Sequence, residues 1–217
     1  LETPDLTPLY AMNTNQKRAF DLFFASAGLL LLSPVFPMLA LAVKLSDGGS
    51  ALFWQPRVGQ DGRLFRIIKF RSMVAKAETK GPSITADGDR RITRFGRFLR
   101  KTKLDELPQL WNVWRGEMSL VGPRPEVPQY VAAYSPSQRR VLRLKPGITD
   151  LATLAFRNEE ELLRAAPDAE RFYREYCLPH KIELNLAYAE RANLRQDAWI
   201  ILQTLGLISP QRWESSS

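Results

Sequence analysis

The chain of 217 residues is long enough for one domain with a buried core, and its 31 basic and 23 acidic residues give a formal net charge of +8. That charge suits a partner that carries phosphate, a class that includes an anionic membrane, a phosphorylated substrate and a nucleic acid. The single cysteine, Cys177, and the single histidine, His180, exclude a disulfide within the chain and a zinc site made of cysteines and histidines. We interpret His180 as structural because it adjoins a helix-breaking proline, Pro179, so catalysis should depend on carboxylates and cations.

An apolar stretch, residues 19–43, carries a single charge, Asp21. As a straight helix of about 1.5 Å per residue it would be long enough to cross a hydrocarbon layer of roughly 30 Å. Pro34 and Pro37 should break it, because each removes a backbone donor and clashes with the preceding turn. The Ser33 hydroxyl is placed to bond a carbonyl that the break frees. The stretch therefore predicts two helices joined by a bend.

Both flanks of this stretch are basic. Lys17 and Arg18 precede it, and further basic residues follow it: Lys44, Arg57, Arg63, Arg66, Lys69 and Arg71. Because lysine and arginine favour the cytoplasmic face, both ends should lie on that face, which predicts a re-entrant membrane hairpin over residues 17–46. Two alternatives stay open: a single transmembrane span, and a cleavable signal peptide whose cleavage site would be the Ala-Leu-Ala of residues 40–42.

The next segment predicts a small β-hairpin and an amphipathic helix. Strands are expected over residues 51–59 and 63–73, joined by a Gln-Asp-Gly turn. A helix over residues 90–102 would gather its basic side chains on one face and its apolar side chains on another. That helix either packs on the core as an ordinary surface helix or lies flat at a lipid interface, where Trp111 and Trp114 would also fit.

The C-terminal third predicts only helices. One begins at Ser135 and stops at Pro146, and the others occupy residues 159–165, 169–177, 181–192 and 197–207. The expected fold is therefore α+β and helix-rich. Its expected parts are an N-terminal extension (1–16), the membrane hairpin (17–46), a single catalytic domain (47–209) and a disordered tail (210–217).

The candidate chemistry lies in residues 100–128, where two adjacent carboxylates, Asp105 and Glu106, stand among lysines and arginines. Along the chain the motifs follow in this order: KRAFD, an apolar run broken by Ser-Pro, KFRSM, RITRFGRFLRKTKLDELPQLWNVWRGEMSLVGPRP and LKPGIT. From about Lys17 to Thr149 this order strongly resembles the bacterial monotopic phosphoglycosyl transferases. Each piece alone would be a weak signal, but the combination is highly specific.

The resemblance implies a reaction and a location. Such enzymes move a phosphosugar from a UDP-sugar to a polyprenol phosphate, usually undecaprenyl phosphate, and release UMP in the first membrane step of surface glycan synthesis, as for exopolysaccharide or lipopolysaccharide. The resemblance further implies a monotopic enzyme of the bacterial inner membrane, with its catalytic domain on the cytoplasmic face, a Mg²⁺ cofactor and no nucleic-acid partner. It leaves the sugar and the oligomeric state open.

The resemblance also carries residue roles. Asp105 corresponds to a nucleophile that attacks the β-phosphorus and forms a covalent aspartyl-phosphosugar, and Glu106 corresponds to the Mg²⁺ ligand. The expected substrate-binding residues are Lys69, Arg71, Arg100, Arg124 and Asp197. One departure stands out, because the family commonly reads KPGITG and this chain has Asp150 in place of the last glycine. A left-handed backbone at that position would disfavour aspartate.

Two rival functions use other features of the sequence. Residues 87–89, in an expected loop over 78–89, read Asp-Gly-Asp and resemble the Asp-x-Asp metal motif of glycosyltransferases, which would release UDP rather than UMP. A membrane-anchored basic module that binds polyanions without catalysis would explain the net charge and the amphipathic helix. It would not explain two adjacent carboxylates beside a Pro-Arg-Pro.

Overall fold

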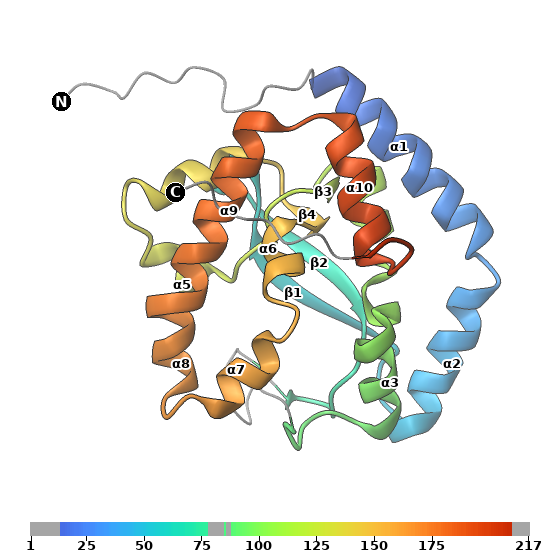
Figure 1. Ribbon diagram of the computed structural model, residues 1–217. Coiled ribbons are helices and arrows are strands. Elements are labelled where there is room, and N and C mark those ends of the chain that lie inside the picture. The colour runs from blue at the N-terminus through green and yellow to red at the C-terminus, as the bar shows by residue number, and fades with distance from the viewer. Residues whose placement is uncertain (1–13, 78–84, 86–87, 210–217) are drawn as a thin grey trace.

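A computed structural model describes residues 14–77, 85 and 88–209 of the chain (Figure 1). The described part is α+β and helix-rich, and it contains two small sheets of two strands each. Three of the expected segments fall wholly or largely outside it, namely the N-terminal extension 1–16, the loop 78–89 and the tail 210–217.

The apolar stretch folds into two helices, α1 (Thr14–Leu31) and α2 (Val35–Asp47), which bend by 66° at the break between them. The Ser33 hydroxyl donates to the carbonyl of Leu30 at 2.8 Å, so the break and its hydroxyl bond are confirmed. Pro37, which we also expected to break the helix, instead lies in the first turn of α2. The backbone N–H groups of a first turn have no acceptor within the helix, so a proline is tolerated there.

Of the described helices, none is by itself long and apolar enough to cross a membrane, whereas α1 and α2 together are, by length and composition. The two helices run along one side of the molecule, drawn in blue in Figure 1. Seven of their large apolar side chains are exposed: Phe23, Phe24, Leu30, Leu31, Met38, Leu41 and Leu45. The outer surface of the pair is therefore apolar and is not covered by the described residues.

The predicted β-hairpin is confirmed. Strands β1 (Leu52–Val58) and β2 (Leu64–Phe70) are antiparallel, and a 3₁₀ turn at Gln60–Gly62 joins them. Phe70 at the end of β2 packs with buried residues of α2 and of α3 (Arg94–Thr102) in a small cluster. This cluster packs the end of α2 against the β-hairpin and α3.

Helix α3 begins four residues later than we predicted. Thr93 caps it, because its hydroxyl accepts a hydrogen bond from the backbone N–H of Gly96 at 2.8 Å. Ile92, which we had placed in the helix, forms a β-bridge with Met73 instead. A 3₁₀ turn (Leu104–Glu106) and helix α4 (Gln109–Arg115) follow α3.

A second sheet, of two short parallel strands, was not predicted. Strands β3 (Ser119–Val121) and β4 (Gly147–Thr149) have three residues each, too few to show an alternating pattern in the sequence. The backbones at the ends of these strands approach closely at Gly122 and Gly147, a contact that we call the glycine crossing. A Cβ added to Gly122 would lie 2.3 Å from the carbonyl oxygen of Lys145. The sheet therefore requires small residues at this crossing.

The C-terminal region is helical, as expected, with several differences in detail. Its helices are α5 (Pro128–Ala132), α6 (Leu151–Ala155), α7 (Glu159–Ala165), α8 (Ala169–Phe172), α9 (Leu178–Arg191) and α10 (Leu194–Thr204). The helix predicted from Ser135 is only a 3₁₀ segment, Gln138–Arg143. Pro179 does not interrupt the helix, because a π-helical turn at Tyr173–Cys177 joins α8 directly to α9, and Pro179 lies in the first turn of α9.

Buried polar side chains tie α1 to the rest of the protein. The Lys17 ammonium pairs with Asp197 of α10 at 2.6 Å, and the hydroxyl of Tyr188 donates to the same carboxylate. The Asp21 carboxylate accepts from the backbone N–H of Leu120 in β3 at 3.0 Å. Buried charges need such partners, so these contacts hold α1 in one position.

Arg18 supports a different element. Its guanidinium donates to the carbonyls of Val113 at 2.6 Å and Trp114 at 2.7 Å, at the end of α4. The last carbonyls of a helix have no N–H donors within the helix, and a cation near them is favourable. Lys17 and Arg18, which we expected as flanking charges of a membrane segment, thus also have structural bonds within the protein.

The glycine crossing gives a stability test. Gly122→Ala should lower the free energy of unfolding by about 2 kcal/mol or more, because the new methyl group overlaps the Lys145 carbonyl and must push β3 and β4 apart. Gly116→Ala is the matched comparison: it has a positive φ of 83° but no close backbone contact, so about 1 kcal/mol is expected. Thermal or urea unfolding measures both, and an equal or smaller loss for Gly122→Ala would contradict the tight crossing.

Candidate active site

The two adjacent carboxylates lie in the turn between α3 and α4. Lys103 takes a left-handed conformation, with φ of 58°, and ends α3 by bonding its N–H to the carbonyl of Arg100. The chain then makes the 3₁₀ turn that carries Asp105 and Glu106, and Pro108 starts α4. Both carboxylates are buried, with 6% and 8% of their residue surfaces exposed.

Glu106 is the centre of a buried cluster of charges. Lys69 of β2 donates to its Oε1 at 3.0 Å, and the guanidinium of Arg124 donates to both carboxylate oxygens, with Nη1 at 3.3 Å from Oε2. Burial would raise the pKa of Glu106, but the charges of Arg124 and Lys69 outweigh it and hold that pKa well below its ordinary value. Glu106 is therefore ionised over the physiological pH range.

The pKa of Lys69 is also shifted by its surroundings. Burial lowers its pKa to about 8, and the nearby guanidinium groups of Arg124 and Arg57 act in the same direction, against the attraction of Glu106. A lysine with a pKa of about 8 can lose or keep its proton near neutral pH, so its charge depends on the neighbouring charges. It would be sensitive to a further anion, because a phosphate beside it would favour the ammonium form.

Asp105 differs sharply from its neighbour. Its Oδ1 atom is buried and makes no hydrogen bond with the described residues. Burial raises the pKa of Asp105, and the negative charge of Glu106 raises it further, while Lys69, Arg100 and Arg124 oppose the shift. Two adjacent carboxyl groups whose pKa values are pushed apart are a frequent sign of separate chemical roles.

The Pro-Arg-Pro turn that carries Arg124 is held from two sides. The Asp150 carboxylate accepts from the backbone N–H of Arg124 at 3.1 Å, and the guanidinium of Arg57 donates to the carbonyl of Pro125 at 2.9 Å. Asn185 of α9 donates to Asp150 at 2.9 Å and so fixes the carboxylate. These contacts define the path of the turn and direct Arg124 toward Glu106.

Asp150 therefore does not strain the backbone. Its φ of −156° is extended, a conformation open to any residue, and its side chain caps α6 by accepting from the N–H of Thr153. The cost that we associated with the loss of a glycine does not arise, because no left-handed backbone is present. The replacement instead supplies a carboxylate that anchors both α6 and the turn before it.

The remaining predicted site residues are bound elsewhere. Arg100 pairs with Glu160 of α7, although its charge still reaches Asp105. Arg71 pairs with Asp47 at the end of α2, and the buried Asp197 is engaged by α1. The structure thus brings together Lys69, Asp105, Glu106 and Arg124, with Arg100 at the border. Neither Arg71 nor Asp197 has a described contact with this cluster.

Metal ligands are few among the described residues, which contain no group of three His, Cys, Asp or Glu side chains arranged to hold an ion. Mg²⁺ often needs only one or two carboxylates, with substrate phosphates and waters supplying the other oxygens. A single buried carboxylate such as Glu106 fits that mode. In the rival Asp-Gly-Asp motif Asp87 lies outside the described residues, and both oxygens of Asp89 accept from Arg91.

Our reading of the sequence missed several residues that shape the site. Asn112 of α4 is buried and bonds both the N–H of Ile68 and the carbonyl of Arg66 on β2. Gln109 is equally buried, one turn earlier in the same helix. A signal was present, because the polar residues Gln109 and Asn112 follow the two carboxylates at helical spacing, and the other residues from 107 to 111 are apolar. The roles of Arg57 and Asp150 left no such signal, since they depend on contacts between distant elements.

Comparison with known proteins gives the family. The pattern described as bacterial sugar transferase matches residues 12–210. The chain is 41% identical over 178 residues to the UDP-glucose:undecaprenyl-phosphate glucose-1-phosphate transferase of Escherichia coli, covering 78% of the chain and 38% of that relative. It is 39% identical over 173 residues to the exopolysaccharide production protein ExoY of Rhizobium meliloti, covering 73% of the chain and 75% of that relative.

A third relative is the undecaprenyl-phosphate glucose phosphotransferase of Komagataeibacter xylinus, 44% identical over 154 residues, which cover 68% of the chain. The chain spans only 29% of the length of this relative, and 38% of the Escherichia coli one. The family pattern, over residues 12–210, runs through the helix pair, the buried charges and the Pro-Arg-Pro turn. The chain belongs to the bacterial sugar transferase family.

Proposed function

We propose that this chain is a phosphoglycosyl transferase, which moves a phosphosugar from a UDP-sugar to a polyprenol phosphate. One observation carries the proposal: a buried carboxyl group with an unbonded oxygen, Asp105, adjoins an ionised glutamate that is held by a lysine and an arginine. Phosphoryl transfer needs an oxygen nucleophile and positive charge around the phosphoryl oxygens, and this cluster offers both.

The reaction proceeds in two displacements at one phosphorus atom. A carboxylate oxygen of Asp105 bonds to the β-phosphorus of the UDP-sugar, and the bond from that phosphorus to the bridging oxygen breaks, so that UMP leaves with the electron pair. A phosphate oxygen of the polyprenol phosphate then bonds to the same phosphorus, and the carboxylate of Asp105 leaves. The products are UMP and a polyprenol diphosphate sugar, and the enzyme is returned unchanged.

The cations have defined parts in this scheme. Arg124 and Lys69, now paired with Glu106, would share their donors with the equatorial phosphoryl oxygens, and the arginine fork suits bidentate contact with phosphate. Arg100 would join them when it exchanges Glu160 for a phosphate. Mg²⁺, when held by Glu106 with the diphosphate, would neutralise the charge that builds on the departing UMP.

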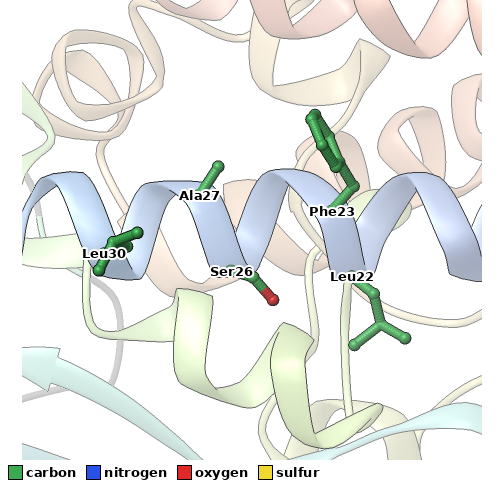
Figure 2. Close-up of a pocket in the computed structure, with 5 residues that line it drawn as sticks. All are labelled: Leu22, Phe23, Ser26, Ala27 and Leu30. Carbon is green, nitrogen blue, oxygen red and sulfur yellow. The ribbon is translucent and has the colours of Figure 1, made fainter.

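The lipid substrate requires a membrane, and the α1–α2 pair is suited to enter one leaflet and return. Helix α1 presents an open apolar hollow of about 540 Å³ along its outer side, lined by Leu22, Phe23, Ser26, Ala27 and Leu30 (Figure 2). Trp111 and Trp114 of α4, half exposed and stacked at 5.0 Å, fit the boundary between lipid and water. We place the cluster of charges at the cytoplasmic face of the inner membrane.

The relatives support the substrate class but vary in the sugar. Their names specify glucose, galactose or N-acetylgalactosamine as the transferred sugar, and several name undecaprenyl phosphate as the acceptor. For this chain we propose undecaprenyl phosphate as the acceptor and a UDP-sugar as the donor. UMP release from a panel of UDP-sugars would select the donor.

The nucleophile gives the first test of function. Asp105→Asn keeps the size of the side chain but removes the attacking oxygen, so turnover should fall by at least about 10³-fold and no covalent adduct should form. Intact-protein mass spectrometry after mixing with UDP-sugar alone measures the adduct, and UMP release measures turnover. Asp89→Asn is the matched control and should keep both.

Three results would refute all or part of this proposal. Turnover by wild-type protein without any gain of phosphosugar mass would exclude the two-step scheme. Release of UDP instead of UMP would favour a glycosyltransferase. Salt-sensitive binding of polyanions that persists in Asp105→Asn, with no turnover of any UDP-sugar by the wild type, would favour the basic binding module.

Glu106 and the metal give a second test. Chelation of divalent ions should stop UMP release, and added Mg²⁺ should restore it. Glu106→Gln should lower the maximal rate and raise the Mg²⁺ concentration needed for half-maximal rate, because a neutral amide holds the ion less well. Glu190→Gln, on the exposed side of α9, is the control. An unchanged Mg²⁺ requirement in Glu106→Gln would exclude this residue as the ligand.

The bend between α1 and α2 gives a test of topology. Cysteines introduced at Thr14 or Ser50, at the two ends of the pair, should react with an impermeant thiol reagent from the same side of the membrane. Pro34→Leu should straighten the pair, so that one end becomes reactive from the opposite side in part of the molecules. Pro37→Leu should not, because Pro37 lies within the first turn of α2. Labelling of the wild-type ends from opposite sides would contradict a re-entrant hairpin.

A further inference from the structure

The polar residues of the segment from Asp105 to Asn112 form one stripe. Leu107 and Pro108, which join the 3₁₀ turn to α4, have helical backbone angles, so residues three or four apart lie on about the same face. At one end of the stripe Asn112 bonds the backbone of β2 at Ile68, and at the other end Glu106 pairs with Lys69 of the same strand. Gln109 lies between these two attachments, and its side chain therefore faces β2 beside the carboxylates.

Gln109 has no partner that explains its burial. Only 1% of its surface is exposed, and its Nε2 atom makes no hydrogen bond with the described part of the chain. An amide donor buried without an acceptor destabilises a protein, so such groups are rare unless they serve another purpose. Four residues earlier, Oδ1 of Asp105 is a buried acceptor without a donor. A donor and an acceptor, each unbonded, thus stand one helical turn apart.

We infer that Gln109 is a positioning residue for Asp105: its amide donates to Oδ1 when the site is occupied, and the other carboxylate oxygen is thereby turned toward the phosphorus. We expect side-chain rotation to make this bond, because the two residues are four apart along a segment with helical backbone angles. The bond fixes which oxygen attacks and in which direction, and attack on phosphorus is sensitive to both.

The inference deepens the proposed function and rests on it. The alternative is that Gln109 merely fills space between α4 and β2. The two can be separated, because a side chain that only packs can be replaced by an apolar one of the same length without loss of rate. A side chain that binds the UDP-sugar directly would change the KM for that substrate.

The experiment compares Gln109→Met with wild type in the full chain. Methionine keeps the length of glutamine and lacks the donor. We expect the rate constant for adduct formation at saturating UDP-sugar, measured by rapid quench and intact mass, to fall about 10- to 100-fold. The KM for the UDP-sugar should stay within about twofold, and the thermal unfolding midpoint should not fall, since a buried unbonded donor is removed.

Controls and a second variant make the result decisive. Gln196→Met is the matched control, because Gln196 also has a buried unbonded amide atom, Oε1, in the first turn of a different helix, α10, and its rate should be unchanged. Gln109→Asn retains a donor that stops about one carbon–carbon bond short, so it should lose rate like Gln109→Met. It replaces the methionine variant if that protein does not fold.

Three outcomes would overturn the inference. These are a wild-type rate in both Gln109 variants, a raised KM with an unchanged rate constant, and an equal loss of rate in Gln196→Met. Failure of the proposed function looks different, because wild-type protein would then form no adduct at all. Adduct formation by wild type and its loss in Asp105→Asn must therefore be established in the same series.

Discussion

The site depends on one buried interaction, the pairing of Glu106 with Lys69 and Arg124. Two cations cannot be placed in a protein interior without an anion, and the glutamate supplies it. Burial raises the pKa of the neighbouring Asp105, and the negative charge of Glu106 raises it further, because a second negative charge is unfavourable so close to the first. A single arrangement of charges thus separates two adjacent carboxyl groups into an ion-paired residue and an unbonded one.

The charges are held by elements that come from distant parts of the chain. Lys69 lies on β2, the carboxylates follow α3, and Arg124 follows β3. Arg57 and Asp150 hold the turn of Arg124 from either side, and the glycine crossing sets the distance between β3 and β4. The sheet of three-residue strands is small, but it determines where the arginine lies.

The apolar helix pair is connected to this site by buried polar contacts rather than by a flexible link. Lys17 and Asp21 bind α10 and β3, and Arg18 binds the end of α4, the helix that begins just after the carboxylates. A membrane-embedded α1 would therefore hold α4 at a fixed depth. This arrangement would bring the charged cluster close to the head group of the proposed lipid substrate, which stays in the bilayer.

Local sequence determined a good part of this protein. Pro34 and Ser33 set the bend, alternation and a turn set the β-hairpin, and the motifs around Asp105 gave the family and the candidate nucleophile, because each of these depends on residues near one another in the chain. Only the tertiary structure decided the rest. It assigned Asp197 to the anchor of α1, removed Arg71 from the charge cluster, made Asp150 a support of Arg124 and left Nε2 of Gln109 unbonded near the candidate nucleophile. Those roles depend on which distant segments pack together, and no local pattern encodes that.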